Sequence, residues 1–296
     1  MKVLVTGAAG MLAAEVVPEL LNQRHTVIQI DINQRLPEIR KLDVTNFDQV
    51  LAFAKKNQPD YIFHLAAETD VDLCERNPDY AFRVNCSGTK NIAIACQKYN
   101  ITMLYISTAA VFYGDKATPY DEFDTPKPIN IYGRSKLEGE VAVENLLSKF
   151  FIIRAGWMVG GWDIDKKFVY KIVQQLKADK KELTVVADKF GSPTFTKDFA
   201  KNIMNVINTK RYGLYHMANK GTCSRYEIAL KILEFMGMDG KVKVNPVDSA
   251  SFPLFAPRPN SEMLKNHKLE LLSLNNMPRW EDSLKEYIEV NSDKSK

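Results

Sequence analysis

Short apolar runs alternate with amphipathic stretches along the first half of the chain. Five of these runs predict strands, at Lys2–Val5, Thr26–Ile30, Tyr61–Leu65, Met103–Ser107 and Phe151–Arg154. Each run is almost continuously hydrophobic, as in parallel strands that are covered on both faces. The stretches between them predict helices at Met11–Asn22, Phe47–Asn57, Pro78–Tyr99 and Tyr132–Ser148. This alternation predicts an α/β fold with a doubly wound, Rossmann-like parallel sheet built from right-handed βαβ units.

The pattern becomes less regular after Arg154. Gly156–Trp162 predicts a loop, and later patterns predict further helices and strands at Phe168–Lys177, Leu183–Val186, Thr196–Asn208, Gly213–Met217, Ser224–Phe235 and about Trp280–Val290. We therefore expect a Rossmann domain over residues 1–158 and a smaller, mainly substrate-binding C-terminal lobe over residues 159–290. About residues 187–212 of that lobe are expected to return to the Rossmann domain. The polar residues 291–296 predict a frayed tail.

The composition is ordinary for a soluble protein of 296 residues, with 45% hydrophobic residues. A net charge of +4, spread along the chain, argues against a surface dedicated to nucleic acid. No apolar run approaches the roughly 20 residues that a membrane helix needs, and no signal-peptide pattern is seen, so we expect a cytoplasmic protein. The cysteines form no Cys-x-x-Cys pair and the histidines have no metal-ligand spacing. Free thiols and no metal site are therefore expected.

A glycine-rich turn joins the first predicted strand to the first predicted helix. Its spacing is Gly7-x-x-Gly10-x-x-Ala13, with Met11 and Leu12 between the last two positions. Glycine permits a tight turn and lets backbone N–H groups approach a pyrophosphate at the positive end of the helix. The turn therefore predicts a dinucleotide site, and the alternative is a tight βα turn without a ligand.

Asp31 ends the second predicted strand. A carboxylate there can accept hydrogen bonds from the adenosine ribose and would repel a 2′-phosphate, which favours NAD(H). Arg35 lies close enough in the sequence to leave NADP(H) open, and a solvated turn aspartate is the alternative for Asp31. Asp43 and Val44 follow the next turn and are candidates for contact with the adenine edge.

Small residues follow the third predicted strand, in His64-Leu65-Ala66-Ala67. Small side chains at the carboxyl end of a parallel strand leave room for a cofactor to cross the sheet, so Leu65, Ala66 and Ala67 are candidate cofactor contacts. An ordinary strand end accounts for them almost as well. His64 is expected to pack and hydrogen-bond inside the sheet rather than to act as a base.

Tyr132 and Lys136 lie four residues apart in a predicted helix, which places both on one face. A phenol has a pKa near 10, and a nearby ammonium is expected to lower that pKa. Tyr132 can then donate a proton to a carbonyl oxygen, while Lys136 holds the ribose of a nicotinamide cofactor. Ser107 and Thr108 end the fourth strand, where a hydroxyl can orient the same carbonyl or, alternatively, cap a turn.

Taken together, these motifs resemble the extended short-chain dehydrogenase/reductase superfamily and, within it, the dTDP-4-dehydrorhamnose reductase family. The resemblance runs through almost the whole chain. The superfamily pieces are the glycine turn, His64-Leu-Ala-Ala67, Asn85 with Gly88-Thr89, and Tyr132-Gly-x-Ser-Lys136-x-x-Gly139-Glu140. The family pieces are Thr69-Asp-Val71-Asp72, Ser107-Thr108, Arg154 with Trp157, Gly191-Ser-Pro193-Thr194 and Arg258-Pro259-x-x-Ser261.

The resemblance implies roles for particular residues of this chain. Thr108, Tyr132 and Lys136 match the catalytic trio of the family. The residues that match its sugar-nucleotide contacts are Thr69, Val71, Thr108, Trp157 and Arg258. The implied reaction is reduction by NAD(P)H of the C4 keto group of a dTDP-linked 6-deoxyhexose, in dTDP-L-rhamnose biosynthesis. The partner is then a nucleotide-diphosphate sugar, and a homodimer stays open.

One departure from the family pattern concerns the substrate. The family continues Ser-Thr with Asp-Tyr, whereas this chain has Ala109-Ala110. The exact sugar therefore stays open. The alternatives are an epimerase or dehydratase of the same superfamily, or a non-catalytic regulatory homologue. A dehydratase needs an acid after Ser-Thr, which Ala109 does not supply.

Overall fold

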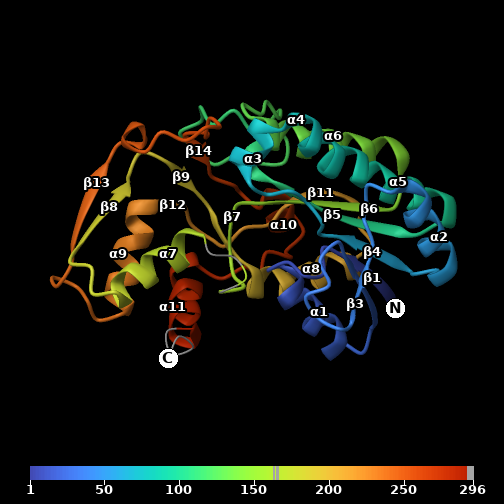
Figure 1. The fold of residues 1–296 in the computed structure, drawn as a ribbon, viewed down its shortest axis with the longest axis horizontal. Helices are drawn as coiled ribbons and strands as arrows, with labels where there is room; N and C mark the ends of the chain where they lie inside the picture. Colours follow the sequence, from blue (N-terminus) through green and yellow to red (C-terminus); the bar gives the residue numbers. More distant parts are fainter. Residues whose placement is uncertain (163, 165–166, 292–296) are drawn as a thin grey trace.

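The computed structural model describes residues 1–162, 164 and 167–291. Its main sheet has seven parallel strands in the order β11-β6-β5-β4-β1-β2-β3 (Figure 1). These strands are β1 (Lys2–Thr6), β2 (Thr26–Asp31), β3 (Ile39–Lys41), β4 (Tyr61–His64), β5 (Thr102–Thr108), β6 (Phe150–Ala155) and β11 (Gly213–His216). The order reverses between β1 and β4, and open α/β sheets bind ligands beyond the carboxyl ends of such strands. The predicted doubly wound sheet is confirmed.

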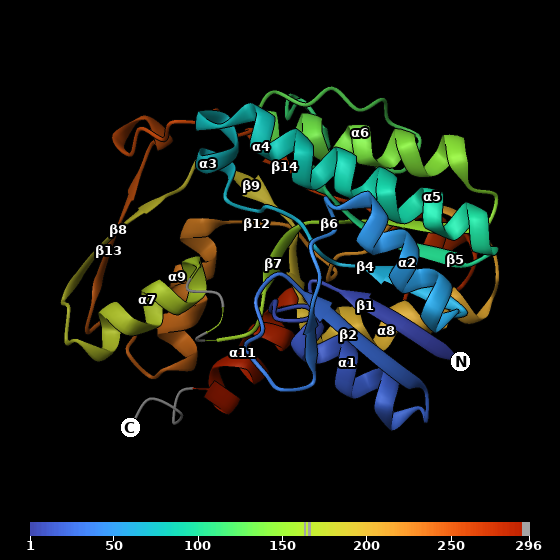
Figure 2. The same ribbon diagram turned by 45° about the vertical axis from the view of Figure 1, so that its right-hand side comes forward.

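Helices cover both faces of this sheet (Figure 2). One face packs against α1 (Ala13–Asn22), α8 (Thr196–Asn208) and α10 (His267–Leu271). The other face packs against α2 (Phe47–Asn57), α5 (Thr89–Tyr99) and α6 (Ile131–Leu146). Leu104 of β5 belongs to the first core, and its neighbours Met103 and Tyr105 belong to the second, because successive side chains of a strand point to opposite faces. Two apolar faces explain why the strands read as continuous hydrophobic runs.

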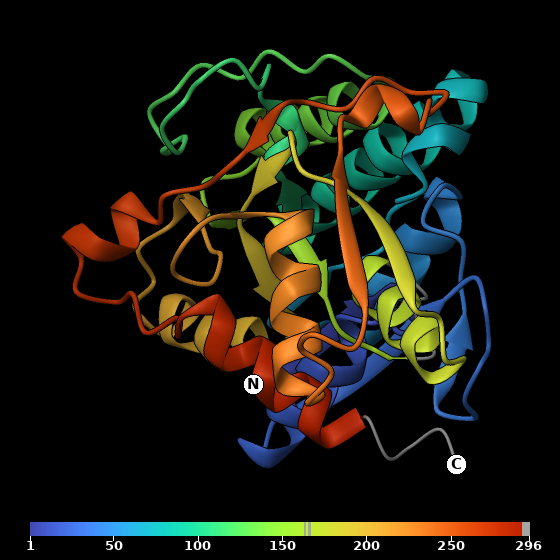
Figure 3. The same cartoon turned by 90° about the vertical axis from the view of Figure 1, so that its left-hand side faces the viewer.

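A third core holds the smaller lobe, which faces the viewer in Figure 3. It is built from α7 (Phe168–Lys177), α9 (Arg225–Phe235), α11 (Trp280–Asn291) and the parallel pair β8 (Glu182–Val186) and β13 (Lys243–Val247). Short strands line its side toward the main sheet: β7 (Trp157–Val159), β9 (Phe190–Gly191), β10 (Pro193–Phe195), β12 (Cys223–Ser224) and β14 (Ser261–Glu262). No helix of the described ranges is long and apolar enough to cross a membrane.

The chain crosses between the lobe and the sheet more than once. After β10 it runs into α8, which packs on α1 below the main sheet, and then into β11. β11 pairs in parallel with β6, with Gly213 opposite Phe151, and it forms the edge of the main sheet. The predicted strand at Gly213–Met217 is therefore part of the first sheet.

The predicted helix over Pro78–Tyr99 is confirmed, but it is not α-helical throughout. It consists of α4 (Pro78–Phe82), a π-helical turn over Arg83–Gly88, and α5. The side chain of Asn85, inside the wide turn, accepts a hydrogen bond from Glu68 N at 2.9 Å and donates to Ser135 Oγ at 3.0 Å. This turn ties the segment after β4 to α6. The sequence also did not predict a separate short helix, α3 (Val71–Arg76), between β4 and α4.

Candidate active site

The glycine-rich turn lies where β1 and β4 separate. Gly7 has a φ of 69°, and a β-carbon at this position would lie 2.6 Å from the backbone nitrogen of Ala66. Only glycine lets the two strand ends approach so closely. The N–H of Gly10 donates to the carbonyl of Gly7 at 3.0 Å, and no side chain of the described residues caps α1, whose N-cap is Leu12. The first amides of α1 therefore remain available to an anionic group.

Asp31 braces this turn. Its Oδ2 accepts from the N–H of Ala9 at 3.0 Å, and its Oδ1 accepts from the N–H of Asn33 at 2.8 Å. The carboxylate is thereby fixed at the end of β2, beside the glycines. Arg35 is exposed in the segment that follows. The arrangement places a negative charge within reach of any ligand that lies along the turn.

Asp43 and Val44 lie at the same edge of the sheet as Asp31, because the N–H of Leu42 donates to the carbonyl of Asp31 at 2.9 Å. Oδ1 of Asp43 accepts from the N–H of Thr45 at 2.8 Å, so the side chain caps its own turn. Val44 is buried, and its side chain packs against Gly88. The structure thus brings the two candidate adenosine contacts next to Asp31.

His64 is a buried structural residue, as predicted. Its Nδ1 hydrogen-bonds with Thr6 Oγ1 at 2.8 Å and its Nε2 with Thr89 Oγ1 at 3.1 Å. Burial, with a smaller contribution from Lys136, lowers the pKa of His64 to about 3. Leu65, Ala66 and Ala67 follow it and are partly exposed, with Ala66 against the glycine turn.

Thr108 and Tyr132 hydrogen-bond through their side chains at the carboxyl end of β5, and Lys136 follows one turn later on α6, with its ammonium over the ring of Tyr105. Asn130 caps α6, because its side chain accepts from the N–H of Gly133 at 2.8 Å, and this cap sets where Tyr132 enters the helix. Thr108 Oγ1 accepts from the N–H of Ala110 at 3.1 Å. A hydrogen bond with the side chain of Thr108 also lowers the pKa of Tyr132, although burial is the larger effect.

Burial dominates the ionisation of the two proton-carrying groups. It raises the pKa of Tyr132 to about 12 and lowers the pKa of Lys136 to about 7. The sequence-based expectation of a lowered pKa for Tyr132 is therefore wrong for the protein alone. The free-energy cost of burying the phenolate is larger than the stabilisation that its polar neighbours provide. At neutral pH, Tyr132 is a protonated donor and Lys136 lies close to its own titration point.

A buried ion pair lies one turn beyond Lys136 and received no role in the sequence analysis. Arg154 donates to both carboxylate oxygens of Glu140, at 2.9 and 2.6 Å, and both side chains are almost fully buried. Glu140 opposes the fall in the pKa of Lys136. Lys136 and Glu140 are spaced i and i+4 on one helix, so their spacing in the sequence could have indicated that they interact.

The candidate substrate residues come from two parts of the fold, the segment around α3 and the smaller lobe. Thr69 is exposed, and Val71 begins α3 on the side of the sheet. Trp157 lies in β7, and its Nε1 donates to Glu262 Oε2 at 2.7 Å. Arg258 donates through Nη1 to the carbonyl of Ala256 at 2.8 Å.

Asp72 of α3 connects the segment around α3 to the smaller lobe. Its Oδ1 accepts from the N–H of Ala256 at 2.9 Å and forms an ion pair with Arg258 Nη2 at 3.1 Å. The carbonyl of Pro257 also accepts from Asn130 Nδ2 at 3.0 Å. The lobe segment that carries Arg258 is therefore tied to both α3 and the start of α6.

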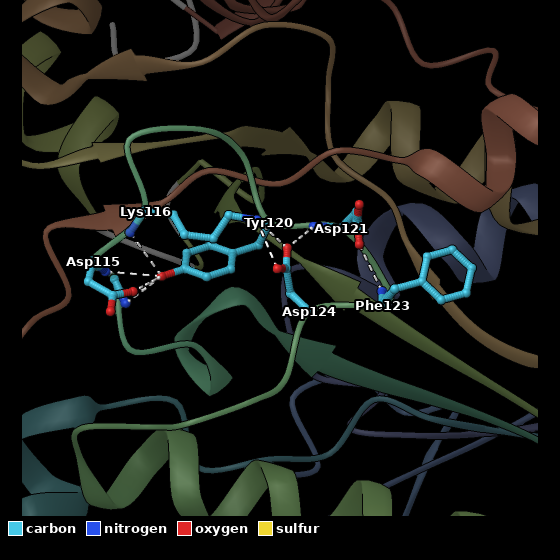
Figure 4. A network of polar contacts seen from close by, with 7 residues as sticks. Asp115, Lys116, Tyr120, Asp121, Phe123 and Asp124 are labelled. Atoms are coloured by element: carbon cyan, nitrogen blue, oxygen red, sulfur yellow. Dashed lines mark hydrogen bonds and ion pairs between the residues drawn. The ribbon is translucent and has the colours of Figure 1, made fainter.

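The loop after Thr108 is fixed by Tyr120 (Figure 4). The hydroxyl of Tyr120 accepts from the N–H groups of Gly114 and Asp115 at 2.9 and 3.0 Å and donates to Asp115 Oδ1 at 2.9 Å. Its ring stacks on Phe112, with 4.3 Å between the centroids. Lys116 pairs with Asp124 at 2.6 Å across the same loop.

Known protein families and curated proteins resemble this chain in sequence. The family described as RmlD substrate binding domain matches residues 1–292. A dTDP-4-dehydrorhamnose reductase from Mycolicibacterium smegmatis is 32% identical over 289 residues, which cover 97% of this chain and 85% of that protein.

Solved structures agree. A dTDP-4-dehydrorhamnose reductase from Clostridium acetobutylicum superimposes with a TM-score of 0.92 at 38% identity, covering 99% of this chain and 100% of that chain. A dTDP-4-dehydrorhamnose reductase from Bacillus anthracis, solved in complex with NADP, gives a TM-score of 0.89 at 37% identity, covering 98% of this chain and 99% of that chain. This chain, matched along nearly its whole length, belongs to the RmlD substrate binding domain family.

Proposed function

We propose that this chain is an NAD(P)H-dependent oxidoreductase that reduces the C4 keto group of a nucleotide-linked 6-deoxyhexose, as in dTDP-L-rhamnose biosynthesis. The observation that carries the proposal is the side-chain hydrogen bond between Thr108 of β5 and Tyr132 of α6, with Lys136 one turn later on the same helix. Relatives at 32% and 31% identity that are named dTDP-4-dehydrorhamnose reductase support it.

The residues around the glycine turn fit a dinucleotide. The first amides of α1, near Met11 and Leu12, would hold the pyrophosphate, because no described side chain competes for them. Gly7 and Gly10 let the backbone come close. When bound, NAD(P)H supplies the hydride.

The chain's own residues handle the proton. With a pKa of about 12, Tyr132 holds its proton at neutral pH and can give it to the carbonyl oxygen as that oxygen gains charge. Thr108 would orient the same oxygen. Lys136, once protonated, would stabilise the phenolate that remains and hold the cofactor ribose. Leu65, Ala66 and Ala67 would line the path of the cofactor across the sheet.

NADH is the proposed cofactor of choice. Asp31 is held rigidly at the end of β2, where a 2′-phosphate would meet its negative charge. Asp43 and Val44 would border the adenine at the same edge. Competition between NADH and NADPH at equal concentration tests this, since a preference for NADPH would contradict the assignment to Asp31.

Thr69, Val71, Trp157 and Arg258 are proposed to hold the sugar nucleotide. Ala109 and Ala110 are buried in a 3₁₀ turn over Ala109–Val111, next to this site. Neither can offer a side-chain hydrogen bond, so reduction relies on the trio alone. An epimerase or dehydratase is disfavoured, because Ala109 provides no acid beside Thr108.

Purified enzyme with NADH or NADPH and a panel of nucleotide-linked 4-keto-6-deoxy sugars tests the function. The proposal predicts loss of the absorbance of the reduced nicotinamide and formation of a 4-hydroxy product. Bound cofactor with no turnover across the panel would favour a regulatory homologue. We further propose a cytoplasmic location and a homodimer, which cell fractionation and sedimentation test.

A further inference from the structure

Arg225 is a partly buried arginine that the proposed function leaves without a role. It is the first residue of α9, directly after β12, which pairs with β9 (Figure 2). Its guanidinium lies 4.4 Å from the centroid of the Trp157 ring and 5.2 Å from that of Phe168. These two rings hold its stem and head in place.

The guanidinium of Arg225 has no hydrogen bond or ion pair with any residue that the structure describes. Burial lowers its pKa, but a guanidinium remains charged at neutral pH. The nearby carboxylate of Glu262 raises the pKa of Arg225, but less than burial lowers it, and its Oε2 accepts from Trp157 Nε1 at 2.7 Å. A partly buried cation with its donors unused is costly, and such a cost is kept where an anion binds.

A second arginine lies in the same electrostatic neighbourhood. Arg258 lowers the pKa of Arg225, although less than burial does, so the two positive charges act on each other. Arg258 is fixed by the carbonyl of Ala256 and by Asp72, at 2.8 and 3.1 Å. Two positive charges that act on each other repel, and an anion with several oxygens between the two guanidinium groups would relieve that repulsion.

We propose that Arg225 binds the diphosphate of the nucleotide-sugar substrate, together with Arg258. The inference rests on the proposed function, since it names the contact that holds the same substrate. Guanidinium groups suit phosphate oxygens because their donors form a planar fork. Trp157, which carries the guanidinium of Arg225 on its ring, would then support both that guanidinium and the sugar end of the substrate.

Calorimetric titration with dTDP, in the presence of NADH, tests this assignment without any turnover. Arg225→Met is expected to weaken dTDP binding by about 10- to 100-fold, the loss of one charge-assisted contact. Thymidine, which lacks phosphate, should bind the variant and the wild-type protein equally. Arg211→Met is the matched control, because Arg211 is exposed just before β11, the edge strand of the main sheet.

Unchanged dTDP affinity in Arg225→Met, or no dTDP binding by the wild-type protein, would overturn the proposal. The proposal would also be overturned if Arg225→Met weakened binding of the intact dTDP-sugar but not of dTDP. Arg225 would then contact the sugar and not the diphosphate. Should Arg225→Met fail to bind NADH, Arg225→Gln decides in its place, with the same expected loss. Arg225-dependent dTDP binding without reduction of any keto sugar would refute the proposed function and leave the diphosphate subsite standing.

Discussion

The ammonium of Lys136 lies 4.2 Å from the centroid of the Tyr105 ring, and the Tyr105 hydroxyl donates to the carbonyl oxygen of Lys136 at 3.2 Å. One residue of β5 therefore holds both the backbone and the charged end of Lys136. The contact places the ammonium against the central strand β5, and its burial there lowers the pKa of Lys136 to about 7. The contact with Tyr105 thus accounts for both the position and the burial of the Lys136 ammonium.

Tyr105→Phe keeps the ring under the ammonium and removes only the hydroxyl. We expect the free energy of unfolding to fall by about 1 kcal/mol, since one buried hydrogen bond is lost. Turnover should change by less than about threefold, because the cation–ring contact remains. Urea denaturation and steady-state rates measure both. A much larger loss of turnover would mean that the hydroxyl takes part in the chemistry.

Lys136→Met should stabilise the cofactor-free protein. Since the folded pKa of Lys136 is about 7 and that of the unfolded chain is near 10.5, the folded state binds fewer protons between these values. The stability of the wild-type protein therefore rises with pH across this window. The free-energy cost of burying the charged ammonium of Lys136 is greatest below pH 7.

Urea denaturation of Lys136→Met and wild type at pH 6.5 and pH 10 measures this effect. The variant is expected to be more stable by about 1–3 kcal/mol at the lower pH, with the difference shrinking at the higher pH. Equal pH slopes in the two proteins would contradict the depressed pKa.

Glu140→Gln leaves the guanidinium of Arg154 buried with only a neutral partner. We expect a loss of about 3–5 kcal/mol in the free energy of unfolding. The double variant Glu140→Met with Arg154→Met is the control and should recover much of this loss, because no unpaired charge then remains. Thermal and urea unfolding measure both proteins. A loss below about 1 kcal/mol in the single variant would show that water reaches the pair.

Gly7→Ala tests the close approach of β1 and β4. Its β-carbon would lie 2.6 Å from the backbone of Ala66, whereas a β-carbon at Gly237, which has a similar φ of 63°, would meet nothing within 4 Å. Gly237→Ala is therefore the control for backbone strain alone, at about 1–2 kcal/mol. Gly7→Ala should cost more and weaken NADH binding by at least about tenfold. Equal effects in the two variants would argue against the close packing.

The main sheet was predictable because its strands are buried on both faces and its helices follow a regular period. The π-helical turn was not, since it depends on hydrogen bonds of Asn85 to Glu68 and Ser135, which are distant in the sequence. Strands as short as β9 and β12, with two residues each, carry no periodic signal at all.

The site shows the same division. The spacing of Tyr132 and Lys136 on one helix is local, so the sequence revealed the pair. Tyr105 and Arg225 act through contacts between elements that only the fold brings together. The direction of the Tyr132 pKa shift was missed for a related reason, because burial is a property of the whole fold and not of its nearest neighbours in the sequence.

The most direct test of the account compares Tyr132→Phe with the wild-type enzyme. NADH affinity is measured by fluorescence titration, and turnover is followed with a dTDP-linked 4-keto-6-deoxyhexose. The account predicts unchanged NADH affinity and a turnover that falls by about 100- to 10,000-fold, because the proton donor is lost while the binding site remains. Turnover within about tenfold of wild type would contradict the role of Tyr132 as the proton donor.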